Sequence, residues 1–253
     1  MSDHPIFTES IRRIRELLQQ RVAVDDTLGL HLARLSPLER DVLERCIHSS
    51  GDVSIAADLR FSPVAAAVPM AAPLPMAELF LQQSLGSACE HGQAALRSGA
   101  PILTDTAMAA AAVTPMARRT GGNRVACVLD WAPGQAPPGS TRAAVGMERA
   151  WAELALAIGQ GAALAPVVLI GSAPTALERL LDLVASGAPA PSLIIGMPVG
   201  FVGVAESKRH LAESGLDHIR LEGSRGGAGL VAAACNALLR AGRLAAENPP
   251  HLS

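Results

Sequence analysis

Two stretches, Pro166-Val-Val-Leu-Ile-Gly171 and Ser192-Leu-Ile-Ile-Gly196, decide the fold of this chain. Each is a short, unbroken apolar run that ends at a glycine and is followed by residues at helical spacing. Fully apolar strands that alternate with helices indicate a parallel sheet with helices on both faces. Such sheets bind ligands beyond the carboxyl ends of their strands, so we expect the turns at Gly171 and at 196–203 to line a site.

Three further strands are expected on either side of these two, at 101–105, 124–129 and 217–221. Together they predict an α/β fold with three α/β/α layers and a flavodoxin-like, parallel, five-stranded sheet. We expect one domain over 1–253, since this length fills a single large core. An amphipathic helix over 5–20 and a helix that begins at Ser36-Pro-Leu-Glu39 and ends at Gly51 precede the sheet.

Composition excludes several classes of function. Of the 253 residues, 49% are hydrophobic and only 2% aromatic, and the net charge is -2 without a basic cluster, which argues against a nucleic-acid partner. The four cysteines are widely spaced, so we expect free thiols and no metal site. We also expect no membrane span and, because no apolar signal segment is evident, a cytoplasmic protein.

The residues themselves suggest one acid/base group. His48 follows Arg45 by three positions, so both lie on one face of the helix that Gly51 ends. The helix dipole favours a positive charge in that last turn, which suits a proton donor. A histidine at a helix end is also commonly a cap or a satisfied core residue, and Ser10 and Arg15 on the first helix are equally consistent with a solvated polar face.

Arg142 is the second candidate that the residues alone suggest. It follows the expected helix cap at Ser140 and Thr141, so its charge opposes the helix dipole. A cation beside free backbone N–H groups is a poor structural choice and a good receptor for a carboxylate. We therefore expect Arg142 to contact a ligand.

Four motifs resemble those of a known family, the precorrin-8X methylmutases of corrin biosynthesis. They are Gly196-Met-Pro-Val-Gly-Phe-Val-Gly-Val-Ala-Glu-Ser-Lys208, Ala173-Pro-Thr-Ala-Leu177, Gly99-Ala-Pro-Ile-Leu103 and His48-Ser-Ser-Gly-Asp52. The resemblance covers nearly the whole chain. It implies a homodimer that moves a methyl group from C-11 to C-12 of a corrinoid tetrapyrrole, with no cofactor and no catalytic metal.

The resemblance also implies roles for individual residues. His48, in Arg45-Cys-Ile-His48-Ser-Ser-Gly51, matches the acid/base residue of the family. The expected substrate-binding residues are Ser10, Arg15, Arg45, Asp105, Thr141, Arg142, Ser172, Gly196, Met197, Pro198 and Gly200. The chain departs from the family pattern at Ile11, Ala107 and Ser172, and by an insertion around 64–94 whose first part is rich in Ala and Pro.

Two other functions are compatible with the same fold. A tetrapyrrole carrier would keep the pocket without turnover. A flavodoxin-like module that binds FMN or another nucleotide is disfavoured, because the chain has no Tyr and neither tryptophan lies beside a phosphate turn. Gly227-Ala-Gly229 imitates a dinucleotide fingerprint, but no later strand offers an acid for the ribose, so a close-packed helix start explains it better.

Overall fold

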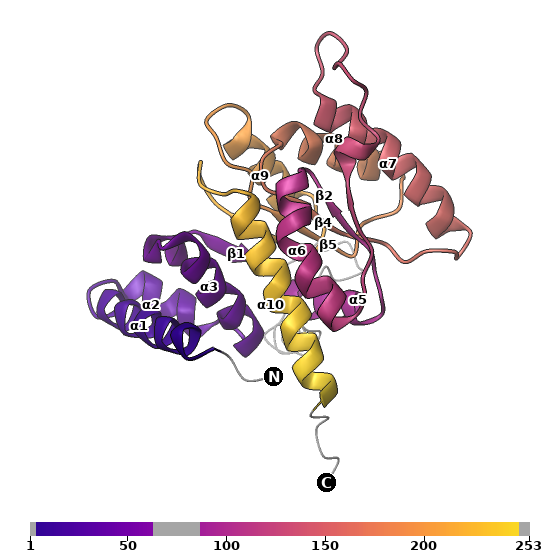
Figure 1. Ribbon diagram of the computed structural model, residues 1–253. Helices are drawn as coiled ribbons and strands as arrows, with labels where there is room; N and C mark the ends of the chain where they lie inside the picture. Colours follow the sequence, from indigo (N-terminus) through magenta and orange to yellow (C-terminus); the bar gives the residue numbers. More distant parts are fainter. Residues whose placement is uncertain (1–3, 63–86, 248–253) are drawn as a thin grey trace, which may run out of the picture.

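A mixed sheet of six strands forms the centre of the computed structural model, which describes residues 4–62 and 87–247 (Figure 1). The strands are β1 (Leu59–Phe61), β2 (Ile102–Thr104), β3 (Val125–Cys127), β4 (Val167–Ile170), β5 (Leu193–Gly196) and β6 (His218–Leu221). Their order is β1-β6-β5-β4-β2-β3. Strands β2 to β6 are parallel, and β1 runs antiparallel to β6 with Leu59 opposite Leu221.

The prediction of a purely parallel sheet of five strands is therefore wrong, because the sheet has a sixth, antiparallel strand. The five predicted strands are present, but β1 adds an antiparallel edge beside β6. Its three residues are too few to show a period, and its central Arg60 is held by an ion pair to Glu222 that no local pattern reveals. In the parallel part, the strand order reverses between β2 and β4, as in a doubly wound sheet. Sheets of this kind bind ligands at such a switch point.

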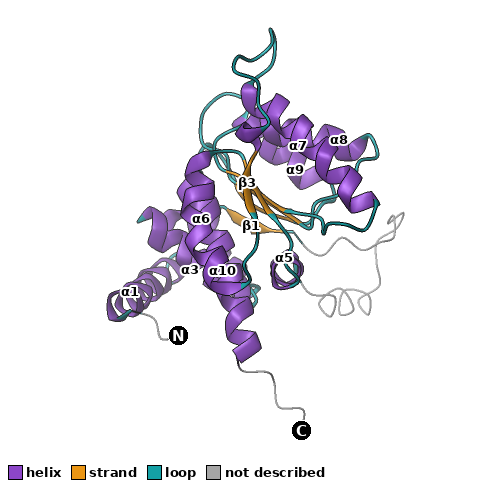
Figure 2. Cartoon of the chain, turned by 45° about the vertical axis from the view of Figure 1, so that its right-hand side comes forward, coloured by secondary structure: helices purple, strands orange, loops and turns teal. Residues whose placement is uncertain are grey.

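Helices cover both faces of the sheet (Figures 1 and 2). Helices α7 (Arg142–Gly159), α8 (Pro174–Ala185) and α9 (Val204–Glu213) pack on one face. Helices α5 (Ala88–Arg97), α6 (Ala107–Thr120) and α10 (Ala228–Glu247) pack on the other. Outside α10 lie α1 (Pro5–Val22), α2 (Asp26–Ala33) and α3 (Pro37–Ser50), and two short 3-10 helices follow α3 and β3: η1 (Val53–Ala57) and η2 (Val128–Asp130).

Local sequence signals place the helix that carries His48. Ser36 accepts a hydrogen bond from the Glu39 N–H at 3.2 Å, and the Glu39 side chain accepts from the Ser36 N–H at 2.8 Å, so the predicted capping box is present. Gly51 ends α3 in the left-handed conformation with φ 68°, which costs glycine little. The helix boundaries predicted for α3 are confirmed.

Other boundaries differ from the expectation. Helix α2 forms where the sequence shows no clear period, because Asp25 accepts a hydrogen bond from the Leu28 N–H at 3.0 Å and Leu28 and Leu32 reach the core. The predicted strand over 124–129 ends at Cys127 and continues as η2. The predicted insertion 64–94 falls mostly on residues outside the described part; its described end belongs to α5.

The core is aliphatic, as the composition predicts, and its elements approach closely. Trp151 is the largest buried side chain, and the rest of the core is mostly Leu, Ile, Val and Ala. Where β5 ends, the backbone at Gly226 approaches so closely that an added Cβ would lie 1.9 Å from the Met197 carbonyl oxygen. Among the described helices, none is long and apolar enough to cross a bilayer.

We predict that Gly226→Ala destabilises the fold by about 1–3 kcal/mol, the usual cost of forcing extra atoms into a packed interior. The atom in the way belongs to the backbone, so the strand β5 corner must move to admit the methyl group. Urea denaturation measures the change. Gly134→Ala is the control, because nothing lies within 4 Å of a Cβ there; equal stability of the two variants would contradict the prediction.

Candidate functional site

Three turns meet at the carboxyl ends of β4, β5 and β6. The Met197 N–H donates to the Ile170 carbonyl oxygen at 2.8 Å, and the Gly227 N–H donates to the Met197 carbonyl oxygen at 2.9 Å. An added Cβ on Gly171 would lie 2.7 Å from the Ala228 nitrogen, so the start of α10 also touches the β4 turn. The glycines at this edge therefore serve close packing of backbone on backbone.

Asp105 lies at the switch point and is fully buried. Its Oδ2 accepts hydrogen bonds from the N–H groups of Gly171, Ser172 and Ala173 at 3.1, 2.6 and 2.8 Å. Its Oδ1 has no hydrogen-bond partner among the described residues. Burial raises the pKa of Asp105 in spite of the three donors. The carboxylate fills the anion-binding turn before α8 from inside the protein.

His48 lies at the same edge, in the last turn of α3. Its Nδ1 is 2.7 Å from the hydroxyl oxygen of Ser10 on α1. The Phe7 ring meets the imidazole edge to face, with 4.9 Å between ring centroids. The adjacent Ser49 hydroxyl donates to the Gly229 carbonyl oxygen at 3.4 Å, which connects this helix end to the first turn of α10. The exposed imidazole is thus oriented from α1 and anchored to the sheet edge through α10.

A groove of about 960 Å³ between α1 and α3 brings Arg15 and Arg45 together. Arg15 makes two hydrogen bonds to the buried Glu44 carboxylate, at 2.7 and 2.8 Å, and this pairing raises the pKa of Arg15. Arg45 pairs with Asp41 at 2.9 Å and lies 4.5 Å over the Phe7 ring. Both arginines already hold a carboxylate of the protein.

Thr141 and Arg142 lie beside α8. The Thr141 hydroxyl caps α7 by accepting from the Ala144 N–H at 3.1 Å, and it is 2.7 Å from the Thr175 hydroxyl in the first turn of α8. The exposed Arg142 donates through Nε to the Pro133 carbonyl oxygen at 2.9 Å. No carboxylate of the described residues pairs with Arg142, unlike Arg15 and Arg45.

The predicted residues thus fall into two groups on one edge of the molecule. Ser10, Arg15, Arg45 and His48 belong to α1 and α3, whereas Asp105, Thr141, Arg142, Ser172, Gly196, Met197, Pro198 and Gly200 belong to the turns beyond the sheet. Four of the second group are buried, namely Asp105, Gly196, Met197 and Pro198, so these shape the turns from within. Direct contact with a ligand is open to the exposed members.

Phe201 and Val202 belong to the turn 196–203 that was expected to line a site, and they are 95% and 88% exposed, which gives the corner an apolar tip. Three other residues at this edge were not predicted. Glu44, Asp41 and Phe7 hold the predicted arginines and His48. Asp41 could have been found from its spacing of four residues to Arg45, but Glu44 and Phe7 depend on how α1 packs against α3.

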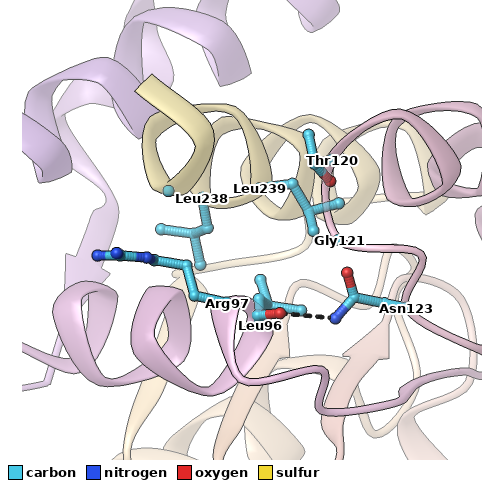
Figure 3. A pocket seen from close by; sticks show the side chains of 8 residues that line it. Leu96, Arg97, Thr120, Gly121, Asn123, Leu238 and Leu239 are labelled. Atoms are coloured by element: carbon cyan, nitrogen blue, oxygen red, sulfur yellow. Dashed lines mark hydrogen bonds between the residues drawn. The ribbon is translucent and has the colours of Figure 1, made fainter. Parts of the chain in front are cut away.

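A second cavity, of about 260 Å³, lies near the amino ends of β2 and β3, at the other end of the strands from the predicted site residues. Figure 3 shows the residues that line it. Leu96, Asn123 and Leu239 are among its lining residues, and none of the predicted site residues is. Asn123 donates from Nδ2 to the carbonyl oxygens of Leu96 and Ala100 at 2.8 and 2.9 Å, just before β2 and β3 begin. We interpret Asn123 as a structural tie between α5 and β3.

Metal ligands do not gather at either edge. Within the side chains that the structure describes, no group of three or more His, Cys, Asp and Glu is placed to hold a metal ion. The four cysteines are buried and unpaired, and burial raises the pKa of Cys46 and of Cys235 to about 12. Their thiols are therefore protonated at neutral pH and unreactive.

Comparisons with known proteins match most of this chain. The model of the precorrin-8X methylmutase family matches residues 5–241. The chain belongs to the precorrin-8X methylmutase family. A cobalt-precorrin-8 methylmutase of Synechocystis is 35% identical over 94% of this chain and 95% of its own, and a precorrin-8X methylmutase of Pseudomonas aeruginosa is 43% identical over 77% and 80%.

The solved structures agree on the fold. A precorrin-8X methyl mutase of Thermus thermophilus superposes with a TM-score of 0.66 at 34% identity, over 94% of this chain and 98% of that one. The resemblance drawn from the four motifs is therefore confirmed at the level of the family. The roles of individual site residues stay predictions.

We predict that Asp105→Ala destabilises the protein by at least about 2 kcal/mol, since three buried N–H donors lose their acceptor. Because burial raises the folded-state pKa of Asp105 above 3.8, the advantage of wild type over the variant is largest below that pH. It decreases as the pH rises through the folded-state pKa.

Denaturant unfolding at several pH values measures both effects. Asp182→Ala, an exposed position on α8, is the control and should change stability by less than about 0.5 kcal/mol. An Asp105→Ala variant as stable as this control would show that the turn before α8 does not need the carboxylate.

Proposed function

We propose that this chain is an isomerase that moves a methyl group from C-11 to C-12 of precorrin-8X or cobalt-precorrin-8, giving hydrogenobyrinate or cobyrinate. The family membership gives the reaction class. The observation that carries the assignment to this site is the contact of 2.7 Å between His48 Nδ1 and Ser10 Oγ at the sheet edge where ligands bind.

The reaction needs a held conformation and a placed proton. The migration is intramolecular: the C-11 to methyl bond breaks as the C-12 to methyl bond forms, and no atom is gained or lost. When the Ser10 hydroxyl donates to Nδ1 of His48, the proton of a neutral imidazole lies on Nε2. That proton can be shared with the macrocycle to favour the electron arrangement that follows migration.

The arginines suit the carboxylate side chains of a corrinoid. Arg142 is exposed and has no carboxylate partner among the described residues, so its charge and the four N–H donors of its two terminal nitrogens can bind a carboxylate without breaking an ion pair. Arg15 and Arg45 must instead share their donors with Glu44 and Asp41. We therefore assign Arg142 the strongest single contact, and Arg15 and Arg45 weaker, shared ones.

One of the two rival functions fits less well, and an experiment separates the other. A nucleotide or FMN phosphate would bind at the turn before α8 in a doubly wound sheet, but Asp105 occupies those N–H groups, and a second anion beside it would be repelled. A tetrapyrrole carrier would bind the corrinoid without changing it. Incubation with precorrin-8X, followed by the absorption spectrum of the ring, separates carrier from isomerase.

We further propose that the protein is a cytoplasmic homodimer. Apolar side chains are exposed on α1, on α2 and between them, among them Ile6, Leu17, Val24 and Leu30. These side chains belong to the same group of helices, α1 to α3, that carries Ser10 and Arg15. A second copy covering them would enclose the groove between α1 and α3.

We expect sedimentation at micromolar concentration to give twice the chain mass of 26.0 kDa. Leu30→Glu places a charge on the expected contact surface and should produce monomers that keep the wild-type circular dichroism. Leu164→Glu is a matched control, because Leu164 is also exposed but follows α7 on the other side of the sheet. A wild-type chain that sediments as a monomer would contradict the pairing.

We predict that His48→Asn lowers turnover by ~10²–10⁴, the range for loss of a positioned acid/base group. Asn keeps a hydrogen bond to Ser10 but has no transferable proton, so the corrinoid product should still bind with wild-type affinity. Single-turnover kinetics and product titration measure the two quantities.

His91→Asn is the control for this change. His91 pairs with Asp217 at 2.8 Å and lies on α5, away from the predicted site, so its loss should leave the rate unchanged. A His48→Asn variant that converts substrate at the wild-type rate would remove His48 from the mechanism.

A further inference from the structure

Lys208 is the only lysine in the sequence. Of the 21 Lys and Arg residues, all others are arginine. Lys208 lies on α9 and is 2% exposed, whereas lysine is among the residues least often buried. A chain that uses arginine everywhere else and buries its single lysine has a requirement at this position that a guanidinium does not meet.

The contacts of the ammonium show what that requirement is. Lys208 Nζ donates to the carbonyl oxygen of Gly223 at 2.8 Å and to that of Arg225 at 2.6 Å. No carboxylate of the described residues pairs with it. A compact ammonium with rotatable donors can bridge two carbonyl groups two residues apart, whereas the planar fork of arginine is wider and fixed. Lys208 therefore holds the backbone of the turn at 223–225.

That turn connects the two groups of site residues. On one side, the Ser224 carbonyl oxygen accepts from the Gly200 N–H at 3.0 Å, which fixes the corner after β5. On the other side, the Arg225 guanidinium donates to Asp52 at 2.7 Å and also to Asp58. Asp52 follows the C-terminal residue of the His48 helix by two positions, so the turn spans from the corner to the acid/base group.

We propose that Lys208 is a positioning residue of the corrinoid site, which holds the 223–225 turn and thereby fixes the Gly196–Gly200 corner relative to the helix end that carries His48. This proposal rests on the proposed function, because part of its test measures turnover of the corrinoid. It adds a role for the last residue of the Gly196 to Lys208 motif, which contacts no ligand itself.

The charges around Lys208 make its protonation state a measurable quantity. Burial, with Arg225 and Arg220, lowers the pKa of Lys208 to about 8. Glu222 and Arg209 are also charged and lie beside Lys208, and Glu222 is paired with Arg60 and Arg220. A neutral amine keeps two N–H donors but loses the charge that strengthens both hydrogen bonds. The turn is therefore held more weakly above pH 8.

Variants test the proposal directly. Lys208→Met keeps the length and removes the donors, and we expect kcat to fall by about 10²-fold, the scale of a misplaced catalytic geometry, with a smaller change in KM. Amide hydrogen exchange at Gly200 should become faster in the same variant, whether or not the protein is active. Arg209→Met, an exposed neighbour on α9, is the control and should change neither quantity.

A double-mutant cycle shows whether Lys208 acts through the turn. Arg225→Met releases the other side of the same turn, so its effect and that of Lys208→Met should be less than additive on kcat. Full additivity, or a Lys208→Met variant with wild-type kcat and wild-type exchange at Gly200, would overturn the proposal. If the wild-type protein does not convert the corrinoid, but Lys208→Met still makes amide exchange at Gly200 faster, the proposed function is contradicted and the role of Lys208 in holding the turn is not.

A measurement on wild type covers the case in which Lys208→Met does not fold. Carbon-13 labelling of lysine gives a single side-chain signal, whose titration should have a midpoint of about 8. Turnover should decline with the same midpoint while the contribution of this group to stability rises between pH 8 and 10.5, because the unfolded chain binds the proton more tightly there. Turnover that stays constant while this signal titrates would overturn the proposal.

Discussion

Direct contact of backbone with backbone at the carboxyl ends of β4, β5 and β6 is the constraint on which the site depends. A Cβ on Gly226 would lie 1.9 Å from the Met197 carbonyl oxygen, and one on Gly171 would lie 2.7 Å from the Ala228 nitrogen. With no side chains between them, these turns exchange hydrogen bonds directly. The start of α10 is thereby fixed, and α3 packs against α10 through Ser49 and Gly229, which places His48. The position of His48, the proposed acid/base group, is therefore a consequence of glycine packing at the ends of these strands.

The parts that local pattern determines were predictable from the sequence. Unbroken apolar runs gave β4 and β5, and a capping box with a terminal glycine gave both ends of α3. Strand β1 was missed because three residues around Arg60 carry no period and pair only once β6 offers its edge. In the candidate site, the roles of His48 and the arginines stay predictions. The contacts of Phe7 with His48 and of Glu44 with Arg15 join α1 to α3, and the sequence does not reveal that packing.

Charge compensation sets how a polycarboxylate can bind at this edge. Arg15 and Arg45 hold Glu44 and Asp41, so a substrate carboxylate that approaches them meets a neutral pair and gains only the difference between two partners. The exposed Arg142 offers a full charge. In the proposed site, binding strength is thus concentrated beside α7 and α8, whereas the proposed proton donor, His48, lies on α3.

Asp105 explains how a sheet with a nucleotide-binding strand order can serve a different chemistry. In a doubly wound sheet, the turn at the switch point presents N–H groups that attract phosphate. Here Asp105 places its own carboxylate on the N–H groups of Gly171, Ser172 and Ala173 and is fully buried in doing so. The N–H groups of that turn are therefore satisfied within the protein, and the groups left for the proposed ligand are on the exposed rim: the apolar tip at Phe201, the guanidinium of Arg142 and the imidazole of His48. One buried carboxylate thus changes what the fold can bind, because ligand choice depends on the groups that remain exposed at its edge and not on the strand order.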